Sequence, residues 1–88
     1  MQRYISLSEV APGQSCTVRR LCMSGSMRRR LMDIGMIENT VVTCVGRSPG
    51  GDPSAYLIRG AVIAIRAKDG RDVLVSAYRG ADRVVEPV

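Results

Sequence analysis

The sequence predicts a small, mainly β domain that carries one helix. Short β-branched stretches recur between turns, and a single segment has the apolar spacing of a helix. The chain of 88 residues is long enough for one thin core. Phe and Trp are absent, so this core has to be built from Val, Ile, Leu, Met and Ala. We expect one domain spanning 1–88, without an internal repeat or a linker.

The helix is expected within residues 27–36. Met27, Leu31 and Ile34 recur at i, i+4 and i+7, so they share one face. Gly35 follows at once, and glycine ends helices because it adopts the left-handed conformation without a Cβ clash. The face with Met27, Leu31 and Ile34 should therefore pack against the core, and the helix should end at Gly35.

Three consecutive arginines, Arg28, Arg29 and Arg30, are expected in the first turn of this helix, and Ser24 or Ser26 can cap its start. Cations in the first turn are mildly unfavourable because they face the positive end of the helix macrodipole. Residues kept against a local preference indicate another role, such as contact with a partner. The net charge of +5 favours an acidic partner, namely nucleic acid, an anionic membrane face or an acidic protein. Solubility alone is the alternative explanation.

Five short strands follow from the β-branched runs and the turn residues between them. They are expected at residues 15–22, 40–45, 54–59, 61–66 and 72–77. The helix is inserted after the first strand, and the single Gly60 between the third and fourth predicts a tight antiparallel hairpin. So small a five-stranded sheet hides its edges by curling. We therefore predict an SH3-like β-barrel, with an OB-type barrel as the alternative.

Two of these strands depart from simple alternation. In the first, Cys16 and Val18 share one face whereas Leu21 falls on the other, so a bulge near Arg19-Arg20 is expected to restore the inward set. In the strand at 40–45 both faces are fairly apolar. Such a strand is covered on both sides or closes into a small barrel, and it leaves room for a dimer.

Catalysis is not expected from this composition. His is absent, which removes the commonest general base and metal ligand. The three cysteines lack the close pairs of a zinc site, and Cys16 and Cys44 are interpreted as small buried apolar groups. The odd cysteine number, the lack of a signal peptide and the lack of an apolar run of about 20 residues favour a cytoplasmic location.

Residues 47–53 form the longest polar loop, which contains two Pro and two Gly. The loop is not a phosphate-binding loop, because no Gly-Lys-Ser/Thr follows. Its expected role is a sharp excursion between strands, with contact to a partner as the functional alternative. Nucleic-acid binding by the barrel is less favoured, because single-strand binders stack bases on aromatic side chains and this chain has three scattered tyrosines.

Several short motifs follow one another in a fixed order. They are Ser6-Leu7, Pro12-Gly13, residues 30–36 (Arg-Leu-Met-Asp-Ile-Gly-Met), 49–53 (Pro-Gly-Gly-Asp-Pro), 58–60 (Ile-Arg-Gly), 63–66 (Ile-Ala-Ile-Arg) and 73–75 (Val-Leu-Val). Over residues 6–76 this pattern resembles the FeoA family, small cytosolic partners of the bacterial ferrous iron transporter FeoB. The Arg-Leu-x-Asp-Ile-Gly and Gly-Asp-Pro motifs are fairly specific together, and neither would suffice alone.

The resemblance implies an SH3-like barrel with a non-enzymatic role in ferrous iron uptake, in which the chain binds the cytoplasmic part of FeoB and meets the membrane only through that partner. The expected partner contacts are Arg28, Arg29, Pro49, Gly50, Gly51, Asp52 and Pro53. The expected structural frame is Leu31, Ile34, Gly35 and Gly60. We expect no cofactor and no catalytic or metal-binding residues. A homo-oligomer stays open.

Three alternatives remain beside this interpretation. They are a basic nucleic-acid-binding module, a metal chaperone that uses the cysteines, and a metal-responsive regulatory module, since the same barrel forms the C-terminal domain of some iron-dependent repressors. The sequence departs from the family where Glu38-Asn39 replaces a frequent Pro-Gly, although Asn also tolerates the left-handed conformation. A second departure is Asp69-Gly70 in place of an acidic-Ala pair. The tail beyond Ser76 lies outside the match.

Overall fold

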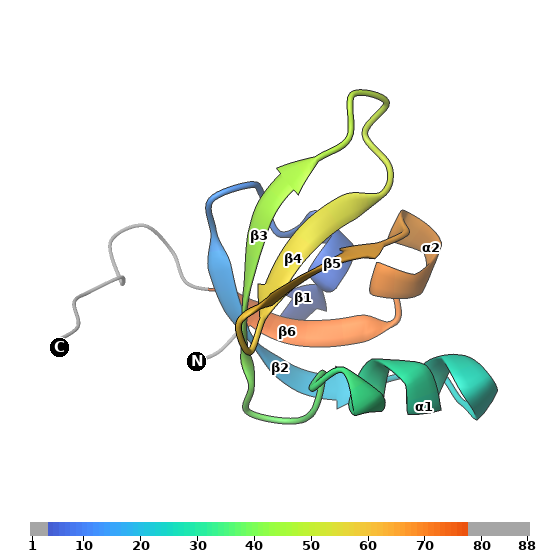
Figure 1. Cartoon of the computed structure of the whole chain (residues 1–88). Helices are drawn as coiled ribbons and strands as arrows, with labels where there is room; N and C mark the ends of the chain where they lie inside the picture. Colours follow the sequence, from blue (N-terminus) through green and yellow to red (C-terminus); the bar gives the residue numbers. More distant parts are fainter. Residues whose placement is uncertain (1–3, 78–88) are drawn as a thin grey trace, which may run out of the picture.

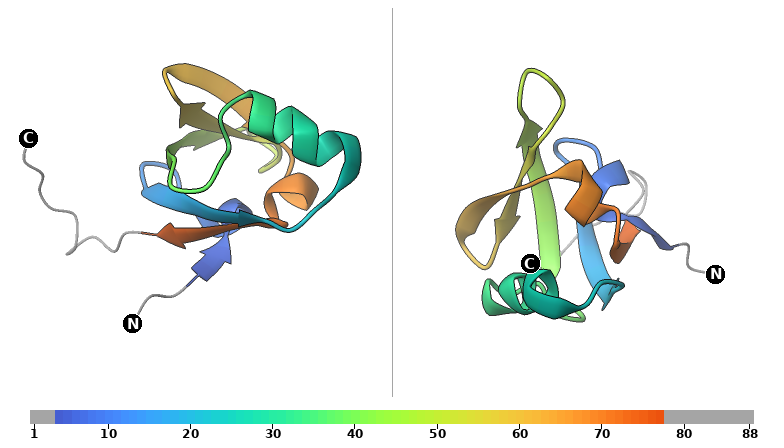
Figure 2. Two further views of the ribbon diagram at one scale, coloured as in Figure 1. Left: turned by 90° about the horizontal axis from the view of Figure 1, so that it is seen from below. Right: turned by 90° about the vertical axis from the view of Figure 1, so that its right-hand side faces the viewer.

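The computed structural model describes residues 4–77, which form one antiparallel sheet in the strand order β1-β6-β2-β3-β4-β5. The elements in chain order are β1 (Tyr4–Ser6), the 3₁₀ helix η1 (Leu7–Glu9), β2 (Ser15–Leu21), α1 (Gly25–Asp33), β3 (Val41–Arg47), β4 (Ser54–Ile58), β5 (Ala61–Ile65), α2 (Ala67–Gly70) and β6 (Val73–Ala77). The sheet curls so that β4 and β5 lie across the molecule from β1, β2 and β6 (Figures 1 and 2). The tail that the family resemblance does not cover lies outside the described residues.

The predicted mainly β fold with one inserted helix is confirmed. The five expected strands correspond to β2, β3, β4, β5 and β6, and β1 is an additional strand of three residues, so α1 follows the second strand of the sheet. β1 pairs with β6 in the register Ile5↔Val75. A segment this short has too few positions for a periodic pattern, and its partner strand defines it.

The bulge expected in β2 is present. The register between β2 and β6 shifts between Val18 and Arg20, which leaves Arg19 as the extra residue. Arg19 uses its side chain at this point, because Nε donates to Ser76 Oγ at 3.0 Å and Nη1 donates to Asn39 Oδ1 at 2.8 Å. The bulge thus keeps the inward face of β2 apolar on both sides of the irregularity.

The β4–β5 hairpin closes over two residues, Arg59 and Gly60, beside the Ile58↔Ala61 pair. Their φ angles are 50° and 86°, so both adopt the left-handed conformation of a type I′ turn. Gly60 takes this conformation without a Cβ penalty. The hairpin predicted from this glycine is confirmed, and the turn adds one arginine with positive φ.

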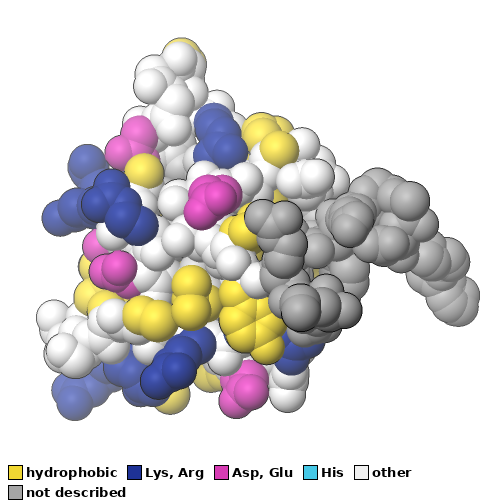
Figure 3. Space-filling view, turned by 180° about the vertical axis from the view of Figure 1, so that it is seen from behind, with side chains coloured by type: hydrophobic (Ala, Val, Ile, Leu, Met, Phe, Trp, Pro, Cys, Tyr) yellow, Lys and Arg dark blue, Asp and Glu magenta, His cyan; other side chains and the backbone are white. Residues whose placement is uncertain are grey.

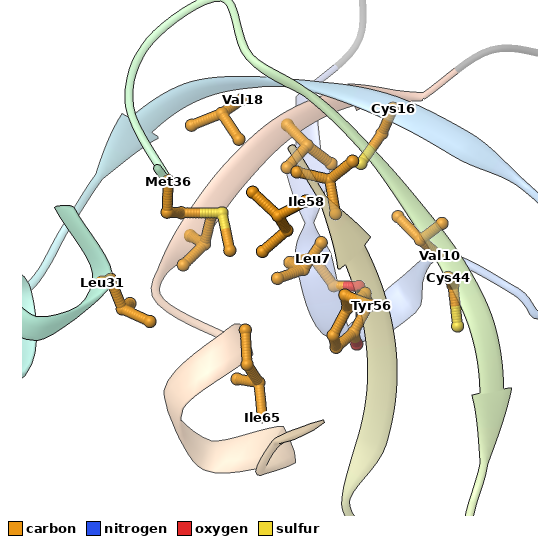
Figure 4. Close-up of a cluster of buried hydrophobic side chains, with 13 residues drawn as sticks. Leu7, Val10, Cys16, Val18, Leu31, Met36, Cys44, Tyr56, Ile58 and Ile65 are labelled. Atoms are coloured by element: carbon orange, nitrogen blue, oxygen red, sulfur yellow. Dashed lines mark hydrogen bonds between the residues drawn. The ribbon is translucent and has the colours of Figure 1, made fainter. Parts of the chain in front are cut away.

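The core is aliphatic apart from one tyrosine, and Figure 4 shows side chains from both halves of the curled sheet converging on it. Its members are Leu7, Val10, Cys16, Val18, Leu31, Met36, Val42, Cys44, Tyr56, Ile58, Ile65, Val73 and Val75. Tyr56 Oη donates to the carbonyl of Leu7 at 3.4 Å. Cys16 and Cys44 are buried, as expected. Burial raises the pKa of the Cys16 thiol from 9.0 to about 12, and the neighbouring Cys44 thiol adds to the rise.

β3 has one buried face and one exposed face. Val42 and Cys44 point into the core, whereas Val41 and Val45 are exposed. Of the two explanations for its apolar composition, the curled sheet is therefore observed, and cover on both faces is not. Within residues 4–77 no helix has the length and apolar character needed to cross a membrane.

Candidate partner-binding surfaces

α1 rests on the barrel through the face that its spacing predicts. Leu31 is buried, and Met27 and Ile34 pack against the core. Ser24 occupies the N-cap position with extended backbone angles, and its side chain makes no capping hydrogen bond. The side chains of Arg28, Arg29 and Arg30 are all exposed. Because successive helical residues are about 100° apart, Arg29 points away from the core, and Arg28 and Arg30 lie on the two flanks of the helix.

The expectation that these arginines lie in the first turn is wrong. α1 begins at Gly25, two residues before the predicted stretch, so Arg28 is its fourth residue and Arg30 belongs to its last turn. The macrodipole therefore does not oppose them, and it favours a cation at Arg30. Arg28 Nη1 also donates to Met32 Sδ at 2.9 Å, one helical turn later. The arginines form a stable exposed row rather than a strained one.

The carboxyl end of α1 packs against the hairpin turn. Gly35 has φ 101°, and a Cβ at this position would collide with Cδ of Arg59. Only glycine combines that backbone conformation with so close an approach. Asn39 lies in the connection between α1 and β3 and has φ 76°. This is the left-handed conformation, which asparagine adopts more readily than most residues. Gly35 and Gly60 thus hold α1 and the hairpin in one arrangement.

The loop between β3 and β4 contains residues 49–53. Ser48 N donates to the carbonyl of Pro53 at 3.0 Å, and Gly51 N donates to the carbonyl of Ser48 at 2.7 Å. The Asp52–Pro53 peptide bond is cis. Asp52 Oδ1 accepts the Ala67 N–H at 2.8 Å, so this carboxylate holds the start of α2. The loop is a braced excursion, as its composition predicts.

Arg47 ties the base of this loop to the N-terminal segment. Nη1 donates to Ser54 Oγ and Nη2 donates to the carbonyl of Val10, both at 2.9 Å. Within residues 4–77, Ser48 Oγ is a buried side-chain oxygen without a hydrogen-bond partner. The Arg47 guanidinium therefore braces the base of the loop against two neutral acceptors.

The expected partner contacts fall on two separate surfaces. α1 lies at one end of the molecule and the loop at residues 49–53 lies at the other, in Figure 1 and in the right-hand view of Figure 2. The frame residues Leu31, Ile34 and Gly35 belong to the α1 end, and Gly60 lies in the hairpin turn that packs against it.

Sequence reasoning did not single out the exposed apolar side chains of β3, β4 and β5. Val41, Val45, Leu57 and Val62 are all exposed large hydrophobic residues. The strand expected at 40–45 did show two apolar faces. The alternation of side chains alone could not show that one of these faces is exposed to solvent. This surface is considered separately below.

Neither a metal centre nor a reaction centre is apparent in the described chain. Residues 4–77 contain no group of three or more Cys, Asp or Glu side chains arranged to hold a metal ion. The Cys16 thiol, with its pKa raised by burial, stays protonated near neutral pH, and a protonated thiol is a poor nucleophile and a poor metal ligand.

The family model for the FeoA domain matches residues 5–77, which include nearly all of the described chain. The chain belongs to the FeoA family. FeoA proteins are associated with ferrous iron transport and are not known as enzymes. The SH3-like barrel predicted from the sequence is confirmed by this membership and by the structural likenesses that follow.

Solved FeoA structures share the arrangement of this chain. A FeoA-like protein from Clostridium acetobutylicum is 32% identical with a TM-score of 0.78, over 86% of this chain and 88% of that protein. FeoA from Chlorobium tepidum is 26% identical with a TM-score of 0.80, over 86% and 72% of the two chains. FeoA from Stenotrophomonas maltophilia, a prokaryotic SH3 domain protein solved with zinc, is 24% identical with a TM-score of 0.74, over 89% and 93%. No curated protein sequence matches the chain.

Proposed function

We propose that this chain is a non-enzymatic accessory protein of ferrous iron uptake that binds the cytoplasmic part of a FeoB-like transporter through α1. The three exposed arginines of α1, Arg28, Arg29 and Arg30, are the observation that carries this proposal. Membership of the FeoA family supplies the iron transport context. The chain acts as a docking module in the cytoplasm, and Fe²⁺ is the cargo of the partner.

The barrel presents the arginines rigidly. Leu31 fixes one face of α1 in the core, and the Gly35–Arg59 packing fixes its end against the hairpin turn. A guanidinium held in this way forms paired hydrogen bonds with a carboxylate, because its planar fork matches the two carboxylate oxygens. The partner surface is therefore expected to be acidic. Such charges accelerate encounter and set the salt dependence of binding more than they set the final affinity.

The loop at residues 49–53 is proposed as a second, separate contact. Because it lies at the other end of the molecule from α1, it would meet a different part of the partner or a second partner element. Its carboxylate is already engaged with α2, so the loop offers backbone groups and prolines rather than a free charge. We expect the loop to contribute less to binding than α1.

The test is a binding titration between the full chain and the purified cytoplasmic region of the transporter. An Arg28→Ala/Arg29→Ala variant should bind at least about tenfold more weakly, since exposed Arg residues at interfaces are frequent hot spots. The matched control is Arg20→Ala/Arg71→Ala, which removes the same charge from two other exposed positions and should bind as the wild type does. Equal binding by the two double variants would remove α1 from the proposal, and failure of the wild type to bind would remove the partner.

A further inference from the structure

The outward side of β3, β4 and β5 is an apolar surface. Val41 and Val45 of β3, Leu57 of β4 and Val62 of β5 are 52%, 47%, 39% and 63% exposed, and we call these four residues the β3–β5 apolar face. Leu57 lies opposite Thr43 on one side and Val62 on the other, so the face continues across three adjacent strands. Contiguous apolar surfaces on small proteins mark sites of interaction.

The outward side of a solvated antiparallel sheet normally carries polar side chains. In the β4–β5 hairpin the outward side carries the pair Leu57 and Val62. The next pair on the same side, two residues along the strands, is Ala55 and Ala64. The inward side is apolar as well, since Tyr56 and Ile58 are buried. The hairpin therefore has two apolar sides, of which the core uses one.

Two exposed cations border β5. Arg59 precedes β5 in the hairpin turn and Arg66 follows it, and both are exposed. The acidic residue between Thr40 and Arg66 is Asp52, whose Oδ1 accepts the Ala67 N–H. β3, β4 and β5 contain no carboxylate of their own. The apolar face is thus bordered at both ends of β5 by cations that have no acidic neighbour on these strands.

The opposite side of the molecule differs. Seen from behind, basic and acidic side chains are interspersed around the apolar atoms (Figure 3). A surface of mixed sign is what solubility alone produces. By contrast, β3, β4 and β5 contain no carboxylate.

We propose that the β3–β5 apolar face binds a partner protein through a segment in which apolar side chains are flanked by carboxylates. The apolar side chains of the segment cover Leu57 and Val62, and its carboxylates pair with Arg59 and Arg66. Each half of this match is needed, because apolar burial supplies affinity and complementary charge selects the partner. The surface is separate from the α1 arginines and from the loop at residues 49–53, so it stands independently of the function proposed above.

A second copy of the chain fits this face less well. An interface between two copies related by a two-fold axis places the same patch on both sides. It would bring Arg59 and Arg66 of both copies together without a carboxylate from either β3–β5 face, and opposed like charges disfavour such contacts. A lipid surface also fits less well, because the face lies on a sheet and carries neither Trp nor Phe, the aromatic side chains that insert at membrane interfaces.

The experiment uses the full isotope-labelled chain and a synthetic peptide with alternating valines and leucines between two pairs of glutamates. We expect saturable chemical-shift changes at Val41, Leu57 and Val62, and binding at least about tenfold weaker when lysines replace the glutamates. Equal binding of both peptides, or changes confined to α1 or to the 49–53 loop, would overturn the proposal. Absence of binding at millimolar peptide would overturn it as well.

Variants locate the contact on the chain. Leu57→Thr/Val62→Thr places a residue of high strand propensity at both positions and should lower affinity at least about tenfold. Met32→Gln is the matched control, because Met32 of α1 is 41% exposed, close to the 39% of Leu57. Concentration-dependent dimerisation or binding to anionic vesicles that Leu57→Thr/Val62→Thr abolishes would assign the face to a second copy or to a membrane and would refute the proposal.

Discussion

α1 and the β4–β5 hairpin pack against each other, yet their exposed faces differ: that of α1 is charged and that of the hairpin is apolar. α1 buries Leu31 and exposes arginines, so its sequence shows at once which side meets the core. The hairpin buries Ile58 and exposes Leu57 and Val62, so both of its sides are apolar. Hydrophobic periodicity therefore locates a core face only where the other face is polar. Where both are apolar, the fold decides which side is left for a partner.

The largest expected effect separates the two sides of β4. Ile58→Ala removes a fully buried side chain and should lower the free energy of unfolding by about 2–5 kcal/mol, through lost burial and the cavity left behind. Leu57→Ala, one residue earlier on the exposed side, should cost less than about 1 kcal/mol. Chemical denaturation of both variants measures the difference. Similar losses would mean that the outward side of the hairpin is already covered within the chain.

The next effect concerns the contact between α1 and the hairpin turn. Gly60→Ala meets no atom within 4 Å and should cost about 1 kcal/mol, because alanine is disfavoured at φ 86°. Gly35→Ala adds a collision with Arg59 to a similar backbone cost, so a loss of about 1–3 kcal/mol is expected. Thermal and chemical unfolding should rank the two variants in this order. A Gly35→Ala/Arg59→Ala variant should recover the difference between them, and failure to recover it would show that Arg59 is not the obstacle.

Local chemistry in the sequence anticipated a good part of this arrangement. Leu21 falls out of step with Cys16 and Val18, and that mismatch correctly predicted the β2 bulge. Gly35 and Gly60 correctly marked the end of α1 and the hairpin turn, because both positions need a backbone conformation that other residues rarely adopt. These features are set by a few consecutive residues, so a single sequence reveals them.

Relations between distant segments were not predictable in the same way. β1 is a strand because β6 pairs with it, and its three residues carry no pattern of their own. The start of α1 at Gly25 moved the arginines out of the first turn, since no strong cap fixed the boundary. The α1 arginines and the 49–53 loop both looked like contact residues, and only the curled sheet places them at opposite ends.

A further effect appears only at high pH, and it comes from the core that both regions share. Burial raises the pKa of the Cys16 thiol from 9.0 to about 12, so the unfolded chain loses this proton first as the pH rises. Because the unfolded state then binds fewer protons than the folded state, stability is constant below about pH 9 and falls as the pH rises from 9 towards 12. Burial also raises the pKa of Tyr56, which acts in the same direction.

Denaturation curves between neutral and alkaline pH check this dependence. Cys16→Ala should flatten the decline, whereas Cys22→Ala should leave it unchanged, because Cys22 is exposed. The same contrast should appear in thiol labelling of the native chain at neutral pH, where Cys22 reacts and Cys16 does not. Rapid labelling of Cys16 would show that the core opens readily, and the pH argument would then fail.

The smallest expected effect returns to α1. Arg29 is exposed and no carboxylate lies in the first turn of the helix, so Arg29→Gln should change the free energy of unfolding by less than about 0.5 kcal/mol. Chemical denaturation at low and high salt measures this, and Arg20→Gln is a control of equal charge on β2. A change near zero in the free energy of unfolding would show that the outward arginine of the helix does not stabilise the fold, as is expected for the outward leucine of the hairpin. A clear loss of stability would instead mean that Arg29 supports the fold, and the case for α1 as a docking surface would have to rest on Arg28 and Arg30.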